Sequence, residues 1–178
     1  MNAAFFLDVE NLWMSICAAR TDLNPAKALR LVLRELKRTM TRAGAQPTVL
    51  RAFGDYSHLH PVVRESVEAV GFDPVQVDAV PRKNSADIAL VLDALECFLT
   101  DDSINVYVII GGDRDYIPLI SRLRRDLDVG VWVAAMEISI GSRTERYVEP
   151  GHIILLDGFL APPSMVQAGS HGIHTSAR

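Results

Sequence analysis

Residues 106–116 read VYVIIGGDRDY, and this stretch decides how the rest of the chain is interpreted. Its first five residues are apolar or aromatic and mostly β-branched, which is typical of a strand buried on both faces of a parallel sheet. Gly111 and Gly112 allow the backbone to turn sharply where this strand ends. Asp113 and Asp115 then lie at the carboxyl end of the strand, where open α/β sheets bind their ligands.

The two aspartates of this stretch have two interpretations. Carboxylates held close together repel each other, and a hard cation such as Mg²⁺ relieves the repulsion. Alternatively, Asp113 caps the helix that follows and Asp115 interacts favourably with the helix dipole. This segment alone leaves both open, and the rest of the chain favours the metal.

Length and composition limit the class of protein. The chain has 178 residues, which predicts one domain, and its 49% hydrophobic content is enough for a core on both faces of a sheet. A net charge of -4 gives no global attraction to nucleic acid, so such a partner needs a local basic patch or a bound metal. Cys17 and Cys97 are the only cysteines, which argues against a disulfide framework and a cysteine zinc site.

The amino end and the apolar runs predict where the protein resides. Residues 1–8 lack the basic region of a signal peptide, and their apolar run is too short for one. No stretch approaches the length of a membrane span. We therefore expect a cytoplasmic protein with no membrane partner.

Strand-like and helix-like segments alternate along the chain. Strands are expected at 3–7, 48–53, 74–77, 107–110, 130–135 and 153–156, and helices at 25–42, 61–70, 85–99, 115–127 and 143–148. This alternation predicts an α/β fold: a single three-layer, doubly wound domain over residues 1–160, with a mostly parallel sheet of about five to six strands. Residues 161–178 are rich in Pro, Ser, Gly and His and predict a flexible C-terminal tail.

Acidic residues fall where such a sheet would use them. Asp8 ends the first strand, and Asp87 lies in the first turn of the helix that begins at Ser85. A doubly wound sheet opens a crevice where the winding reverses. If the first and fourth strands flank that point, Asp8 and Asp113 become neighbours, and the helix that carries Asp87 starts at the same edge.

Asp93 is a different case. It lies six residues after Asp87, which does not match one helical face, and its neighbours are apolar. A charged residue in such surroundings points to solvent or has a partner, such as Lys83, Arg51 or a helix amino end. We expect a supporting or structural role for Asp93.

Three motifs in this order resemble those of the NYN domain family, specifically its LabA-like (DUF88) group within the PIN-like nuclease superfamily. That group has D-x-E-N after an opening strand, a helix with K-x-x-D-[IV]-x-L-x-x-D, and a strand closed by [SG]-G-D-x-D-[FY]-x-P-L. The corresponding stretches here are LDVENL at 7–12, KNSADIALVLD at 83–93 and GGDRDYIPL at 111–119. The resemblance covers residues 3–156. One extra residue between Lys83 and Asp87 departs from the commonest form of the second motif.

The resemblance implies a PIN-like, Rossmannoid fold and a ribonuclease that depends on Mg²⁺ or Mn²⁺, with a role in RNA processing or turnover. It implies that the catalytic, metal-binding acids are those of the motifs, namely Asp8, Asp87, Asp113 and Asp115, with Asn11 in support. Arg82 and Lys83 precede the helix of Asp87 and are candidates to bind the phosphate backbone of the RNA substrate.

Other functions fit parts of the same pattern. A haloacid-dehalogenase-type phosphatase needs D-x-D-x-[TV] at the first strand, where this chain has DVEN at 8–11. A receiver domain needs a lysine after its fifth strand, and this chain has no lysine after Lys83. The serious alternative is a non-catalytic NYN scaffold that binds RNA or a regulatory protein partner. The acidic net charge favours the scaffold, whereas the cost of four carboxylates in one cleft without a cation favours the enzyme. Apolar residues after Asn11 either pack on the sheet or form the face of a homodimer.

Overall fold

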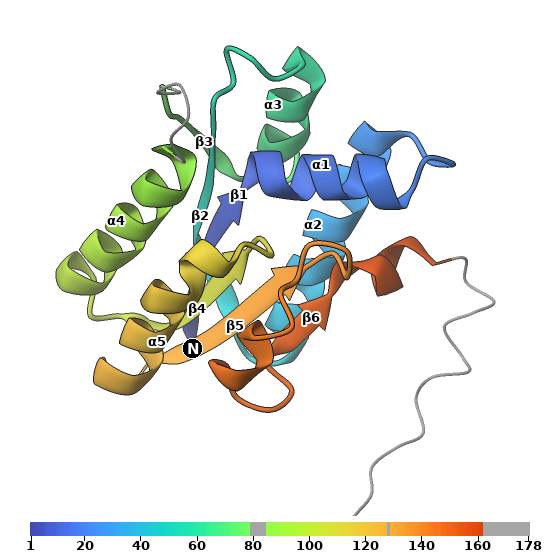
Figure 1. Ribbon diagram of the computed structural model, residues 1–178. Coiled ribbons are helices and arrows are strands. Elements are labelled where there is room, and N and C mark those ends of the chain that lie inside the picture. Colours follow the sequence, from blue (N-terminus) through green and yellow to red (C-terminus); the bar gives the residue numbers. More distant parts are fainter. Residues whose placement is uncertain (79–84, 128, 162–178) are drawn as a thin grey trace, which may run out of the picture.

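Within the residues that the structure describes, six parallel strands form one sheet in the order β3-β2-β1-β4-β5-β6 (Figure 1). The computed structural model describes residues 1–78, 85–127 and 129–161. The strands are β1 (Asn2–Asp8), β2 (Gln46–Gly54), β3 (Asp73–Gln76), β4 (Ile104–Ile110), β5 (Gly130–Ala135) and β6 (Ile153–Leu155).

Helices cover both faces of this sheet (Figure 1). The α-helices in the described part of the chain are α1 (Val9–Ala19), α2 (Pro25–Arg42), α3 (Pro61–Glu68), α4 (Ser85–Thr100) and α5 (Ile117–Asp126). Three short 3-10 helices accompany them, η1 (Arg114–Tyr116), η2 (Thr144–Arg146) and η3 (Leu156–Leu160). The helices α1, α2 and α3 pack on one face, and α4 and α5 pack on the other.

Strand β1 lies in the middle of this three-layer arrangement. Its side chains alternate between the two cores: Phe5 and Leu7 pack toward α1 to α3, and Ala4 and Phe6 pack toward α4 and α5. All four are completely buried. Burial of a large apolar side chain contributes about 1.5–3 kcal/mol, so this alternation holds β1 in one register.

The winding of the sheet reverses between β1 and β4. The chain runs from β1 outward to β2 and β3, and then returns to the other side of β1 for β4, β5 and β6. Leu7 pairs with Ile110 across the reversal, so Asp8 and Gly111 leave the sheet side by side. The carboxyl ends of β1 and β4 therefore meet at the crevice where doubly wound sheets bind ligands.

The structure confirms the predicted doubly wound parallel sheet and the place of its reversal. The segment after Asp8, for which the sequence predicted no element, is the helix α1; Leu12 and Ile16 are buried on the sheet and Met14 is exposed. The helix expected over 115–127 begins as η1 and continues as α5. In place of the helix expected over 143–148, the structure has the shorter 3-10 helix η2. Of the expected tail, residues 162–178 lie outside the described residues.

In the described part of the chain, no helix has the length and apolar character needed to cross a bilayer.

Candidate metal centre

Asp8 is placed by the junction between β1 and α1. It is the last residue of the strand and the N-cap of the helix, and its Oδ1 accepts a hydrogen bond of 3.0 Å from the backbone N–H of Asn11. Only 5% of Asp8 is exposed. Burial raises the pKa of Asp8 to about 7, against hydrogen bonds from Asn11 and Tyr116 that lower it.

Asn11 holds the glycine turn after β4 against this junction. Its Oδ1 accepts a hydrogen bond of 3.0 Å from the backbone N–H of Gly112. Gly112 also leaves room for the loop after β5, because a Cβ there would lie 2.4 Å from the backbone carbonyl carbon of Ser139. The turn is thus fixed from two sides, and Asp113, which follows it, emerges at a defined place.

Three carboxylates converge beside Asp8. Asp87 comes from the first turn of α4, Asp113 caps η1, and Asp115 lies within η1. One carboxylate oxygen from each of the three lies within 4.8 Å of the others. Asp113 also accepts a hydrogen bond of 3.0 Å from the backbone N–H of Asp115, so it serves as the cap that the sequence predicted and as a member of this group. We call Asp87, Asp113 and Asp115 the acidic cluster.

Tyr116 links the acidic cluster to Asp8. Its hydroxyl lies 2.8 Å from Oδ2 of Asp8 and also contacts Oδ1 of Asp87, and the residue is only 1% exposed. Burial and the two nearby carboxylates raise the pKa of Tyr116, so the phenol keeps its proton and remains a donor. Burial, with the charges of Asp113 and Asp115, raises the pKa of Asp87.

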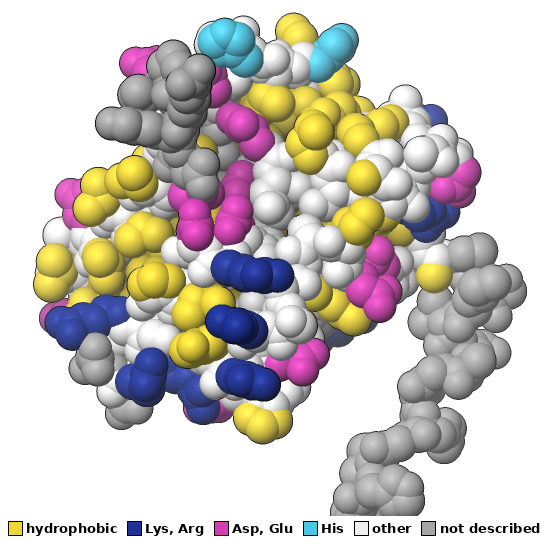
Figure 2. Space-filling model, viewed as in Figure 1, with side chains coloured by type: hydrophobic (Ala, Val, Ile, Leu, Met, Phe, Trp, Pro, Cys, Tyr) yellow, Lys and Arg dark blue, Asp and Glu magenta, His cyan; other side chains and the backbone are white. Residues whose placement is uncertain are grey.

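Asp8, Asp87 and Asp113 line a cleft of about 290 Å³ at the carboxyl ends of the strands. Figure 2 shows acidic side chains gathered there, between the start of α4 and the end of β1. We call it the acidic cleft. Its lining residues are Asp8, Glu10, Asn11, Met14, Asp55, Val77, Ser85, Ala86, Asp87 and Asp113.

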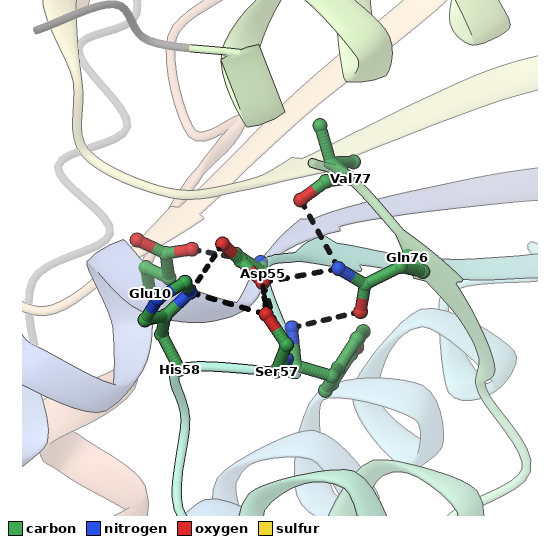
Figure 3. Close-up of polar contacts among 7 residues, drawn as sticks. Glu10, Asp55, Ser57, His58, Gln76 and Val77 are labelled. Carbon is green, nitrogen blue, oxygen red and sulfur yellow. Dashed lines mark hydrogen bonds and ion pairs between the residues drawn. The ribbon is translucent and has the colours of Figure 1, made fainter. Parts of the chain in front are cut away.

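The far wall of the acidic cleft is a hydrogen-bonded turn after β2 (Figure 3). Glu10 accepts a hydrogen bond of 2.9 Å from the backbone N–H of Asp55. The Asp55 carboxylate is bonded in turn to Ser57, to Nε2 of Gln76 at 3.0 Å and to Nδ1 of His58 at 2.7 Å. The hydrogen bonds from Ser57 and Gln76 lower the pKa of Asp55. This carboxylate therefore organises the turn.

The acidic cluster has the donors that a hard divalent cation requires. Carboxylate oxygens are the ligands that Mg²⁺ and Mn²⁺ prefer, and these come from α4 and η1 rather than from one flexible loop. Three like charges within 4.8 Å repel one another, which a cation would offset. The residues present therefore fit a divalent metal ion.

The other predicted site residues lie elsewhere. Asp93 is not part of the acidic cleft; its Oδ1 accepts a hydrogen bond of 2.6 Å from Nη1 of Arg51, one of the partners considered for it. Arg82 and Lys83 lie outside the described residues. The sequence assigned no role at the site to the hydroxyl of Tyr116, because its contacts depend on tertiary packing and leave no spacing signal.

Comparison with known proteins agrees with this fold. The family model described as the NYN domain matches residues 2–148. A crystal structure of a Vibrio parahaemolyticus protein of unknown function superposes with a TM-score of 0.70 and 15% identity, over 89% of this chain and 94% of that one. At this identity the likeness concerns the fold alone. No curated protein matches the sequence significantly. The chain belongs to the NYN domain family, whose PIN-like members are generally nuclease-like.

Proposed function

We propose that this protein is a metal-dependent ribonuclease of the LabA-like (DUF88) group, which hydrolyses phosphodiester bonds in RNA processing or turnover. The observation that supports this most is the convergence of Asp87, Asp113 and Asp115 within 4.8 Å at the reversal of the sheet. Membership of a nuclease-like family supports the same chemistry.

In this proposal each residue of the site has a defined task. The acidic cluster holds Mg²⁺ or Mn²⁺, and Asp8 is the fourth acid of the centre because it lines the same cleft. A bound divalent ion lowers the pKa of a water molecule and offsets negative charge on the scissile phosphate. Asn11 fixes the turn that presents Asp113, and Tyr116 holds Asp8 and Asp87 by hydrogen bonds from its buried hydroxyl. Hydrolysis adds water across one P–O bond and leaves a phosphate monoester and a free hydroxyl.

A second candidate function is a non-catalytic scaffold that binds RNA or a regulatory protein. The contacts of Tyr116 favour it, because they give Asp8 and Asp87 a hydrogen-bond partner that does not depend on an ion. The negative charge at the site argues against the scaffold. The Tyr116 hydroxyl can donate only one proton to the two carboxylates, and Asp113 and Asp115 add further negative charge that a cation would offset.

Cleavage of a mixed pool of end-labelled RNAs and single-stranded DNAs separates the two functions. The assay is run with Mg²⁺, with Mn²⁺ and with EDTA, on the wild type and on Asp113→Asn. The matched control is Asp101→Asn: Asp101 also bonds the backbone N–H two residues on, at 3.0 Å from Ser103, but lies outside the acidic cleft. We expect metal-dependent RNA cleavage that Asp113→Asn abolishes and Asp101→Asn retains. No cleavage of any substrate would favour the scaffold.

A further inference from the structure

A group of exposed arginines lies on η1, α5 and the loop after β5, which come at or after the acidic cluster in the sequence. The chain carries a net charge of -4, so a basic surface has to be local. Figure 2 shows a file of basic side chains that runs away from the acidic cleft, over the face that carries α5 and the loop after β5. We call it the arginine strip; the exposed arginines of these segments are Arg114, Arg122, Arg125, Arg143 and Arg146.

Two chain segments lie alongside each other to form this strip. At one end, the side chain of Arg114 lies over Gly141, where a Cβ would come within 3.0 Å of its Cγ and Nε. At the other end, Nη1 of Arg124 donates to the carbonyl of Tyr147 at 3.3 Å, and its Nε lies 3.7 Å from Glu149. The segment 141–149 therefore follows η1 and α5, and α5 alone is about 15 Å long at 1.5 Å per residue.

The strip begins at the acidic cluster itself. Arg114 stands between Asp113 and Asp115 in the sequence, and the other four arginines extend from it along α5 and η2. Two other arginines have acidic partners elsewhere in the fold. Arg20 is bonded to Asp22 and to the carbonyl of Leu160, and Arg51 is paired with Asp93.

We infer that the arginine strip binds the sugar–phosphate backbone of a single-stranded RNA whose scissile phosphate lies in the acidic cleft. The inference rests on the proposed function. Guanidinium groups match the geometry of phosphate oxygens, and a row of them tracks a phosphate chain. Tyr147 is the aromatic residue of segment 141–149 and is half-buried, so the strip offers mainly charge rather than a platform for base stacking. Recognition along it is therefore independent of base sequence.

A second basic surface provides a matched control. Arg34, Arg38 and Arg42 are also exposed, although Arg38 is paired with Glu35 at 2.9 Å, and they line a separate cavity of about 540 Å³ with Pro47. Pro47 is at the amino end of β2, so this cavity lies at the opposite edge of the sheet from Asp55 and the acidic cleft. Replacing three arginines in either place changes the net charge equally.

The test measures binding of a fluorescein-labelled oligouridylate by anisotropy, in EDTA and over a series of salt concentrations. It compares the wild type with Arg125→Gln/Arg143→Gln/Arg146→Gln and with the control Arg34→Gln/Arg38→Gln/Arg42→Gln. If each arginine of the strip neutralises one phosphate, the strip variant loses about 2 from the slope of log K against log salt, and its affinity falls roughly 10- to 100-fold at 0.1 M salt. The control variant binds like the wild type.

Equal weakening in both variants would overturn the inference, as would unchanged binding in the strip variant or no binding by the wild type. Unchanged unfolding midpoints show that both variants are folded. Hydrolysis of bis(p-nitrophenyl) phosphate with Mn²⁺ tests the acidic cleft by itself, because this diester is too small to reach along the strip. The strip variant keeps this activity. If even the wild type lacks it, the proposed function fails, and the anisotropy series still decides whether the strip binds RNA.

Discussion

Asp113→Asn should change the stability of the protein in opposite directions with and without a divalent cation. Asparagine caps a helix about as well as aspartate, so the hydrogen bond to the N–H of Asp115 is kept and only the charge is lost. Two unit charges 4.8 Å apart repel by about 1 kcal/mol in water and about 3.5 kcal/mol at an effective dielectric constant of 20. Asp115 is exposed and Asp87 and Asp113 are half-buried, so the lower figure applies to each pair, and the loss of the Asp113 charge removes two such repulsions, with Asp87 and with Asp115.

The expected values follow from this repulsion and from ligand linkage. In EDTA, Asp113→Asn should be about 1.7 kcal/mol more stable than the wild type, which is roughly 3–7 °C in Tm for a domain of this size. An ion at 100 times its Kd stabilises the wild type by about 2.7 kcal/mol, and the variant loses this gain. With Mg²⁺ or Mn²⁺ the variant should therefore be about 1 kcal/mol less stable than the wild type.

Urea unfolding followed by circular dichroism, in EDTA and in excess Mg²⁺, measures both values. Asp101→Asn is the control, and its stability relative to the wild type should be the same in the two conditions. The reasoning is refuted if Asp113→Asn is less stable than the wild type in EDTA, or if it gains as much from the cation as the wild type does.

Three further predictions concern the packing around the site. Tyr116→Phe removes the buried hydroxyl that two carboxylates contact, and should lower the free energy of unfolding in EDTA by about 2 kcal/mol; an unchanged urea midpoint would contradict its bridging role. Gly112→Ala places a Cβ 2.4 Å from the backbone of Ser139 and should cost about 1–3 kcal/mol, whereas Gly158→Ala, with nothing within 4 Å of its Cβ, should be close to neutral in the same unfolding assay. Asp55→Asn should destabilise the protein at pH 7 and clearly less at pH 2, which lies well below the ordinary pKa of the carboxyl group. The folded-state pKa of Asp55 is lowered, so its contribution is complete above its ordinary pKa of 3.8 and is lost as pH falls toward the folded value. A variant with the same deficit at both pH values would argue against this hydrogen-bonded turn.

The fold could be predicted from the sequence because its two central strands, β1 and β4, are almost fully buried. A strand covered on both faces is apolar at nearly every position, and both β1 and β4 carry that signal directly before a turn. Alternation with helices then leaves few topologies, and the reversal between β1 and β4 was the condition under which Asp8 and Asp113 were expected to be neighbours; the observed strand order meets it. The helix α1 was not predicted, because residues 12–17 are nearly all apolar and show no clear helical spacing of polar and apolar side chains. In addition, Asp8, its N-cap, was assigned to the strand alone.

The convergence of the acidic cluster could be predicted from the sequence, whereas the hydrogen bonds that join it to the residues around it could not. Asp87, Asp113 and Asp115 follow from strand ends and a helix start, which are local features of the sequence. The contact between Tyr116 and Asp8 joins residues 108 positions apart and depends on how η1 packs against β1. Asp93 shows the reverse: its partner Arg51 was foreseen among several because a half-buried charge requires one, although the choice needed the packing of α4 on β2.

Binding of Mn²⁺ tests most directly whether the acidic cluster is a metal centre. Electron paramagnetic resonance measures free Mn²⁺ during titration of the wild type, Asp113→Asn and the control Asp101→Asn, and Mg²⁺ is then added as a competitor. The account predicts saturable binding to the wild type and to Asp101→Asn, displacement by Mg²⁺, and affinity at least 10-fold weaker in Asp113→Asn, because one of three converging carboxylates is gone. Wild-type protein that leaves Mn²⁺ free, or an Asp113→Asn variant that binds it as tightly as the wild type, would contradict the account.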